Sequence, residues 1–320
     1  MSVQDFKIAG VTIAAGEEKQ IDAQIAKLPT RTPIDIPVIV SRSVNPGPTL
    51  LITGGMHGDE INGIEIVRRI VAKGYNKPLI GTTICIPILN IYGFIHFSRQ
   101  VTDGGKDINR SFPGTKNGSL ASQLAYRLSQ DILPLIDHGI DFHTGGARIN
   151  NYPQIRAMLG DPMNLELAQA FAPRFIINSP FREKSFRKEA ANQGKSILVY
   201  EGGESLRLRK NAIDEGVNGL LRVMKHLKMR NDAPEINIPS LMIKKSTWLR
   251  ARAGGIYHSF FRPGEEVKKG NVVGLITGPF GEFEHPMKSQ TSGYVLSINN
   301  NPVVNRGDAL MNIGIPDLPQ

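Results

Sequence analysis

The sequence predicts an α/β fold over about residues 35–230, in which helices flank a mixed sheet, followed by a smaller all-β domain. In the first part, short apolar runs alternate with segments of helical periodicity, a pattern typical of a sheet with helices on its faces. After about residue 232 the helical period stops, and short β runs with Gly/Pro turns follow. We therefore expect one domain over residues 1–235, including an N-terminal β segment, and a second domain over residues 236–320.

The strands expected in the first domain are apolar runs bounded by turn residues. These runs cover residues 34–43, 49–55, 82–90, 139–145, 155–159 and 196–203. The segment VNPGP joins the first two runs, and its Pro/Gly content predicts a turn and hence an antiparallel hairpin. Apolar residues at three-and-four spacing predict helices over residues 60–73, 121–135 and 211–228.

Composition excludes several classes of protein. Hydrophobic residues make up 40% of the 320-residue chain, which excludes disorder as its main state. The single cysteine, Cys85, excludes a disulfide framework and multi-cysteine metal sites. The N-terminus lacks the pattern of a secretory signal, and no run approaches the ~20 apolar residues of a membrane span. We expect a soluble cytoplasmic protein with no membrane partner.

The net charge of +9 comes from 38 Lys and Arg residues against 29 Asp and Glu residues. The basic residues are spread along the chain, and none of their denser stretches forms a recognisable nucleic-acid-binding motif. We interpret the charge as a solvated basic surface and expect no nucleic-acid partner.

The strongest local motif is GGMHGDE at residues 54–60, between an expected strand and an expected helix. His57 and Glu60 lie three positions apart at the helix start, so their side chains can converge on one cation. The alternative is a plain strand-to-helix turn, in which Glu60 caps the helix and His57 is a polar surface residue.

A second motif, DFHTGG, ends the strand expected over residues 139–145, at a position where open α/β sheets carry functional groups. His143 can supply a third ligand from this distant segment. Two histidines and one glutamate leave one coordination position open, which is the arrangement of catalytic rather than structural zinc. Asp141 could orient a ligand imidazole. The remaining histidines lack such partners and are expected at ordinary surface or packing positions.

Two further motifs carry groups suited to catalysis and binding. Glu201 leaves the apolar strand over residues 196–203 beside two glycines, where a carboxylate can accept a proton from water and deliver it to a leaving amine. Asn109 and Arg110 place a neutral donor beside a fixed cation, a pair suited to a substrate carboxylate. Each motif alone also fits a solvated surface position.

The motifs GGMHGDE, DINRSFPG, DFHTG and YEGG occur in the order of the succinylglutamate desuccinylase/aspartoacylase family, which the chain resembles over about residues 35–230. This family belongs to the zinc carboxypeptidase clan. The trailing β segment is similar to the C-terminal domain of the family's bacterial deacylase branch. The resemblance implies a zinc-carboxypeptidase-like mixed sheet and one Zn²⁺ per chain.

The resemblance also assigns roles to the catalytic candidates. It implies that the zinc ligands are His57, Glu60 and His143. Glu201 would be the general acid/base, and Arg99 would be the cation facing the oxyanion.

The resemblance implies that Asn109 and Arg110 bind substrate, and Thr144, beside His143, is a further substrate-binding candidate. Asn109 and Arg110 would hold the substrate carboxylate. Arg182 and Arg187 are candidates, without a motif, for a further substrate arginine of the family.

These expectations describe a metal-dependent amide hydrolase. We expect a deacylase that cleaves the amide bond of a small N-acyl amino acid or related N-acyl amine bearing a carboxylate. Two alternatives stay open: a zinc carboxypeptidase that acts on short peptides, and a non-catalytic binding protein with a degenerate site. A homo-oligomer is compatible with the sequence.

A weak internal repeat marks the C-terminal β segment. Residues 255–276 and 293–313 each run through Gly, hydrophobics, a turn, a Val-x-x-Gly element and an apolar strand. This pattern resembles the biotinyl/lipoyl-like hammerhead domain, a small β barrel-sandwich whose carrier forms present a modifiable lysine. Lys288 superficially matches that lysine but lies only five residues before Gly293, so we interpret it as a surface lysine. We expect this domain to shape access to the site without supplying catalysis.

Overall fold

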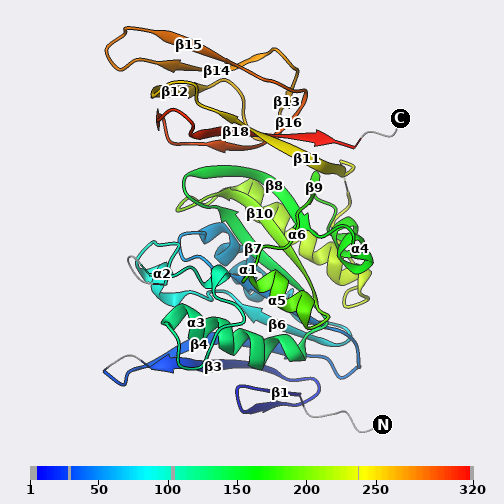
Figure 1. Cartoon of the computed structure of the whole chain (residues 1–320). Coiled ribbons are helices and arrows are strands. Elements are labelled where there is room, and N and C mark those ends of the chain that lie inside the picture. The colour runs from blue at the N-terminus through cyan, green and yellow to red at the C-terminus, as the bar shows by residue number, and fades with distance from the viewer. Residues whose placement is uncertain (1–5, 28–29, 102–104, 237, 318–320) are drawn as a thin grey trace.

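The computed structural model describes residues 6–27, 30–101, 105–236 and 238–317. The first part of the chain forms ten strands within these residues (Figure 1). They are β1 (Phe6–Ile8), β2 (Val11–Ile13), β3 (Glu18–Lys27), β4 (Pro33–Arg42), β5 (Thr49–Gly54), β6 (Thr82–Ile86), β7 (His138–Gly145), β8 (Ile149–Ala157), β9 (Phe175–Asn178) and β10 (Ser196–Glu204).

The C-terminal part is built from strands, as its periodicity predicts. They are β11 (Leu241–Arg250), β12 (Gly255–Ser259), β13 (Glu266–Val267), β14 (Val272–Thr277), β15 (Glu284–Lys288), β16 (Gly293–Asn299), β17 (Val303–Val304) and β18 (Ala309–Pro316). Lys288 lies within β15, opposite Val272 of β14, and outside the turn that joins these two strands. This position supports its interpretation as a surface lysine.

One sheet of twelve strands connects both parts of the described chain, in the order β13-β16-β18-β11-β9-β8-β10-β7-β5-β6-β4-β3. Its centre is parallel, because β6, β5, β7 and β10 pair in one direction, while β4 and β8 run antiparallel to their neighbours β6 and β10. The predicted mixed α/β sheet is therefore confirmed. A second sheet contains β15, β14, β12 and β17.

Helices cover both faces of this sheet. The longer ones are α1 (Ile61–Ala72), α3 (Leu120–Arg127), α4 (Pro162–Phe171) and α6 (Lys210–His226). The shorter ones are α2 (Ile91–Ile95), α5 (Phe186–Asn192), η1 (Ile108–Arg110), η2 (Leu128–Ile132) and η3 (Leu133–Leu135). No helix of the described residues combines the length and apolar character needed to cross a bilayer.

Each face of the sheet has its own apolar core. Helices α1, α4 and α6 pack on one face, and α3 and α5 pack on the other. Successive side chains of a strand point to opposite faces. Leu50 and Ile52 of β5 accordingly enter the core under α1, while Leu51 enters the opposite core. This two-sided burial explains why the three residues in the middle of β5 are all apolar.

The predicted hairpin of residues 34–43 and 49–55 is wrong. Both strands exist, but β6 lies between β4 and β5 and pairs with each of them. Strands β5 and β6 are buried along their whole length, whereas β4 alternates between buried and partly exposed residues. The fully buried strands therefore occupy the centre, and β4 pairs on its outer side with β3 in a hairpin that was not predicted from the sequence.

The helix predicted over residues 121–135 is also shorter than expected. α3 ends at Arg127, and the chain continues through one π turn and one 3-10 turn. Pro134 lies in this last turn, and proline removes a helix-forming N–H and crowds the preceding turn. The helices predicted over residues 60–73 and 211–228 are confirmed as α1 and α6.

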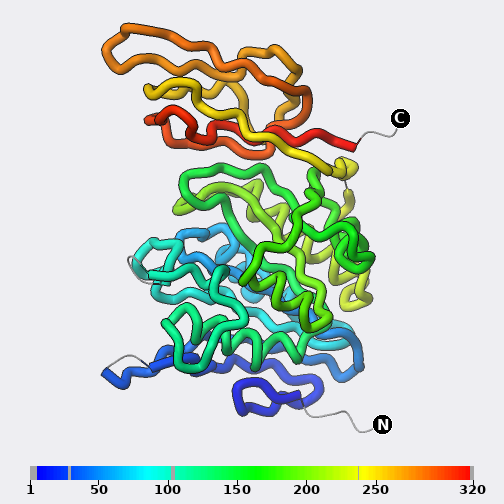
Figure 2. Tube along the Cα trace, in the orientation of Figure 1, coloured from blue at the N-terminus to red at the C-terminus, as the bar shows by residue number. Residues whose placement is uncertain are grey.

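The C-terminal strands are joined to the first part by continuous hydrogen bonding. β11 runs parallel to β9, and β16 runs antiparallel to the outer end of β8. Phe175, Ile243 and Leu296 form a shared apolar cluster at this junction. In the trace, the C-terminal segment, coloured yellow to red, lies above the green segment that contains β8 and β9 (Figure 2). A domain boundary at residues 235/236 stays a prediction.

Candidate metal centre and active site

His57 and Glu60 lie in the turn that carries the chain from β5 into α1. Glu60 occupies the N-cap position of α1, but its side chain makes no capping hydrogen bond. Its Oε1 lies 2.7 Å from Nδ1 of His57 instead. Both side chains are 2% exposed. The alternative of a capping Glu60 and a surface His57 is therefore wrong.

His143 reaches the same carboxylate from β7. Its Nδ1 lies 2.8 Å from Oε2 of Glu60. The approach is possible because the first turn of α1 lies directly on β7: a Cβ on Gly63 would come 2.2 Å from the carbonyl oxygen of Phe142. Only glycine permits such a close backbone approach. Within the described residues, His57, Glu60 and His143 form the one group whose candidate ligand atoms all lie within 4.8 Å of one another.

The chemistry of these donors fits a metal ion. The Nε2 of His57 lies 3.1 Å from Oδ1 of Asp107, and the Nε2 of His143 lies 2.7 Å from Oδ2 of Asp141. Metal-binding histidines commonly donate their outer N–H to such a carboxylate, which leaves the other nitrogen free to bind. Both Nδ1 lone pairs then face the oxygens of Glu60, and a cation between them would remove the repulsion.

The charges of these three side chains stabilise one another. Burial alone would lower the pKa of His143, but the carboxylates of Asp141 and Glu60 raise that pKa well above its usual value. The pKa of His57 is raised in the same way, against burial, by Glu60 and Asp107. Burial opposes the charge on Glu60, yet the two imidazoles hold the pKa of this carboxyl well below its usual range. The group thus favours positive charge around Glu60, which protons or a metal ion can supply.

Arg99 borders this group. Its Nη1 lies 3.2 Å from both Oε1 of Glu60 and Nδ1 of His57, and its Nε and Nη2 donate to Oδ2 of Asp107. Asp107 therefore fixes Arg99 and His57 together. The side chain of Arg99 is 37% exposed, so its guanidinium is accessible from the neighbouring cavity.

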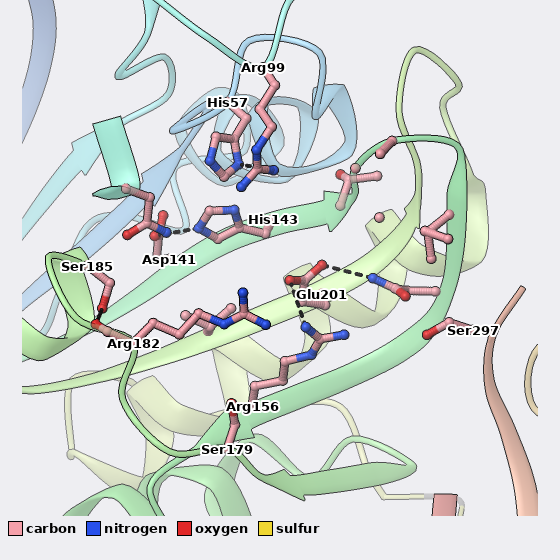
Figure 3. Close-up of a pocket in the computed structure, with 18 of the residues that line it drawn as sticks. His57, Arg99, Asp141, His143, Arg156, Ser179, Arg182, Ser185, Glu201 and Ser297 are labelled. Atoms are coloured by element: carbon pink, nitrogen blue, oxygen red, sulfur yellow. Dashed lines mark hydrogen bonds and ion pairs between the residues drawn. The ribbon is translucent and has the colours of Figure 1, made fainter. Parts of the chain in front are cut away.

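Glu201 lies in the same cavity, which has a volume of about 310 Å³ and is also lined by His57, His143 and Arg99 (Figure 3). It extends from β10, the parallel neighbour of β7, directly opposite His143 in the strand register. The Nδ2 of Asn151 donates to its Oε2 at 2.9 Å, and Nη1 of Arg156 lies 3.5 Å from its Oε1.

The three residues predicted to bind substrate all line this cavity. The backbone N–H of Phe186 donates to Oδ1 of Asn109 at 2.9 Å, which fixes the Asn109 amide with its nitrogen as the remaining donor. Arg110 lies beside it in the short η1 turn. Thr144 donates its backbone N–H to Oε2 of Glu60 at 3.0 Å, and its buried hydroxyl has no hydrogen-bond partner among the described residues.

Arg182 and Arg187 also line the cavity, and with them it becomes strongly cationic. Partial burial lowers the pKa of Arg110, and the guanidinium of Arg182 adds to this effect, while the carboxylate of Asp107 opposes it. Burial and repulsion from Arg156 and Arg182 lower the pKa of Arg187 to about 10. Repulsion among cations in one cavity is relieved when an anion binds.

Several residues at this site were not predicted from the sequence. Asp107 had a local signal, because it precedes Asn109 and Arg110 within the DINR motif. No motif contains Asn151, Arg156, Trp248 or Ser297, which line the cavity. Trp248 and Ser297 belong to the C-terminal strands β11 and β16, so that part of the chain forms one wall of the cavity.

The fold and the site together define an α/β protein with a buried group of two histidines and one glutamate at the ends of sheet strands, of the kind that catalytic zinc uses. The sequence model of the succinylglutamate desuccinylase/aspartoacylase catalytic domain matches residues 46–227, more than half of the chain. This chain therefore belongs to the succinylglutamate desuccinylase/aspartoacylase family.

Individual proteins are also similar to this chain. The N-alpha-acetyl-L-2,4-diaminobutyric acid deacetylase of Halomonas elongata is 28% identical over 255 residues, which cover 75% of this chain and 73% of that protein. The succinylglutamate desuccinylase/aspartoacylase structure from Rhodobacter sphaeroides has a TM-score of 0.83 at 25% identity and covers 94% of this chain and 96% of its own. The product-bound ectoine utilization protein EutE (DoeB) from Ruegeria pomeroyi has a TM-score of 0.85 at 20% identity, with 95% and 97% covered.

Proposed function

We propose that this protein is a zinc-dependent deacylase that hydrolyses the amide bond of a small N-acyl amino acid. The observation that carries the proposal is the convergence of His57, Glu60 and His143 at the wall of an arginine-rich cavity that Glu201 also lines. The family and the deacetylase from Halomonas elongata support amide hydrolysis as the reaction.

In this proposal, His57, Glu60 and His143 hold one zinc ion. When bound, zinc would act as a Lewis acid that polarises the amide carbonyl and makes water more acidic. Asp107 and Asp141 would keep the two imidazoles in the binding orientation through their outer nitrogens.

Glu201 would move the proton. Its carboxylate would accept a proton from the attacking water and deliver it to the nitrogen of the leaving amine as the C–N bond breaks. Arg99, whose Nη1 lies 3.2 Å from Glu60, would stabilise the negative charge that develops on the carbonyl oxygen.

Asn109 and Arg110 would bind the substrate carboxylate, the arginine through paired N–H donors. The wider charge of the cavity favours a further negative group on the substrate. Its lining carboxylates, Asp141 and Glu201, are already bonded within the protein. We therefore propose an acidic amino acid as the amine half, in contrast to the diaminobutyrate named for the relative from Halomonas elongata.

The proposal is tested by measuring amine release from a panel of substrates by the zinc-loaded protein. The panel contains N-acetyl and N-succinyl forms of aspartate, glutamate, alanine and diaminobutyrate, together with short N-blocked peptides. We expect the highest kcat/KM for N-acyl aspartate or glutamate, because each adds a second carboxylate to the substrate.

Faster cleavage of the peptides would show that the protein acts as a carboxypeptidase and not as a deacylase. If kcat/KM is highest for the diaminobutyrate derivatives, the proposed specificity for an acidic amino acid is wrong, but the proposed deacylase activity still holds. A zinc-loaded protein that binds these compounds without turnover would instead support a binding protein.

A further inference from the structure

Strand β8 supplies two side chains to the same carboxylate. Asn151 and Arg156 contact the two oxygens of Glu201. Residues five positions apart point to opposite faces of a regular strand. Here the β8–β10 register shifts: Glu201 lies opposite Gln154 and Gly203 lies opposite Asn151, so two steps along β10 match three along β8. Such a bulge redirects side chains and is frequent beside active sites.

The environment of Asn151 is unusual for a residue that serves packing alone. Its side chain is buried, with 4% of the residue exposed. Its Nδ2 donates to Oε2 of Glu201, while its Oδ1 has no hydrogen-bond partner among the described residues. An unpaired buried carbonyl costs free energy. Among the described residues, the side-chain amide of Asn151 therefore makes its hydrogen bond to Glu201 alone.

The C-terminal strand β16 holds this part of β8 from the other side. Ser297 of β16 lies opposite Asn151 in the antiparallel register. Directly after the end of β16, the backbone N–H of Asn300 donates to the carbonyl of Arg148 at 2.8 Å, and its side-chain amide donates to Glu204 on β10. The segment from Ser297 to Asn300 thus ties together β8 and β10, the two strands that carry Asn151 and Glu201.

We propose that Asn151 is a positioning residue for Glu201. The amide of Asn151 fixes the carboxylate of Glu201 in the orientation that proton transfer requires, and β16 holds Asn151 in place. This inference rests on the proposed role of Glu201 as the general acid/base. A donated hydrogen bond removes rotational freedom from the carboxylate, and small misplacements of a reacting group cost up to about 100-fold in rate.

Substitution of Asn151 tests the inference. Asn151→Ala should lower kcat by about 10-fold to 100-fold, with KM and zinc content close to those of the unmodified protein. Asn151→Asp keeps the shape of the side chain and removes the N–H donor, so it should lose at least as much kcat near pH 8. The matched control is Asn150→Ala, the preceding residue of β8, for which we expect kcat within about twofold.

A double-mutant cycle separates positioning from a general structural role. If Asn151 acts through Glu201, Asn151→Ala should have no further effect on kcat in a Glu201→Gln background, because residues that act as a unit are not additive. Independent losses that multiply would overturn the inference, as would wild-type kcat in Asn151→Asp. Wild-type turnover by Glu201→Gln alone would instead overturn the proposed role of Glu201, so the two failures are distinguishable.

Discussion

Nδ1 of His143 lies 2.8 Å from Oε2 of Glu60, although the two residues are 83 positions apart in the sequence. The contact joins the end of β7 to the N-terminus of α1. It depends on Gly63, whose missing side chain lets the helix approach the carbonyl of Phe142. The candidate metal centre is therefore assembled by the packing of a helix on a sheet strand, and substitution of a residue on either element can test it.

The purified protein should contain about one zinc ion per chain and lose activity when a chelator removes it. His143→Ala should lower zinc occupancy by at least about tenfold, because the loss of even an orienting partner of a ligand typically costs 10–100-fold. Elemental analysis of the dialysed protein gives the occupancy. His258→Ala, an exposed position in β12, is the matched control and should keep full zinc. A His143→Ala protein with full zinc would reject the ligand set.

Zinc affinity should fall as the pH is lowered. Neighbouring carboxylates raise the pKa of His57 and of His143 above 6.5 in the metal-free chain, against the effect of burial. Protons therefore compete with the metal at higher pH than for an ordinary histidine, and zinc binding must release them. Competition with a chromogenic chelator, measured from about pH 5 to about pH 8, should show the decline beginning above pH 6.5. Affinity that is constant across this range would contradict the protonation assigned to the two imidazoles.

Glu201→Gln should bind zinc normally and lose kcat by about 10²–10⁴-fold, the usual contribution of a general acid/base. The substitution keeps the size of the side chain and removes the carboxylate that we propose accepts the proton. Steady-state kinetics and zinc analysis of the same preparation check both statements. Glu284→Gln, at an exposed position of β15, should leave kcat unchanged, and comparable losses in both variants would indicate a general effect of handling or folding.

Arg110→Ala should lower kcat/KM more for substrates with a free carboxylate than for the same substrates with that carboxylate amidated. We expect kcat/KM to fall by about 10-fold to 100-fold for the acid, because a charge-assisted pair is lost, and by much less for the amidated substrate. Arg252→Ala, an exposed residue outside the cavity, is the control for the loss of one positive charge. Equal losses on both substrates would show that Arg110 does not bind the carboxylate.

The periodic parts of the fold could be predicted from the sequence, and the strand order could not. α1 and α6 follow from apolar spacing because each presents one face to the same core. No local sequence pattern predicts that β6 lies between β4 and β5, because strand pairing depends on which strands can be buried on both faces. Turn residues between β4 and β5 indicate a change of direction but do not specify the neighbour of either strand.

For the candidate site, the sequence by itself indicated the candidate groups that lie in compact motifs: His57, Glu60, His143, Glu201 and the Asn109–Arg110 pair. Short segments with special turn chemistry leave a pattern that spacing reveals. Only the tertiary structure decided which groups surround them. Asn151 reaches Glu201 through a bulge in β8, and Ser297 reaches the cavity from the C-terminal strand β16. Contacts of this kind arise from sheet register and from the docking of the C-terminal strands, which no local sequence pattern specifies.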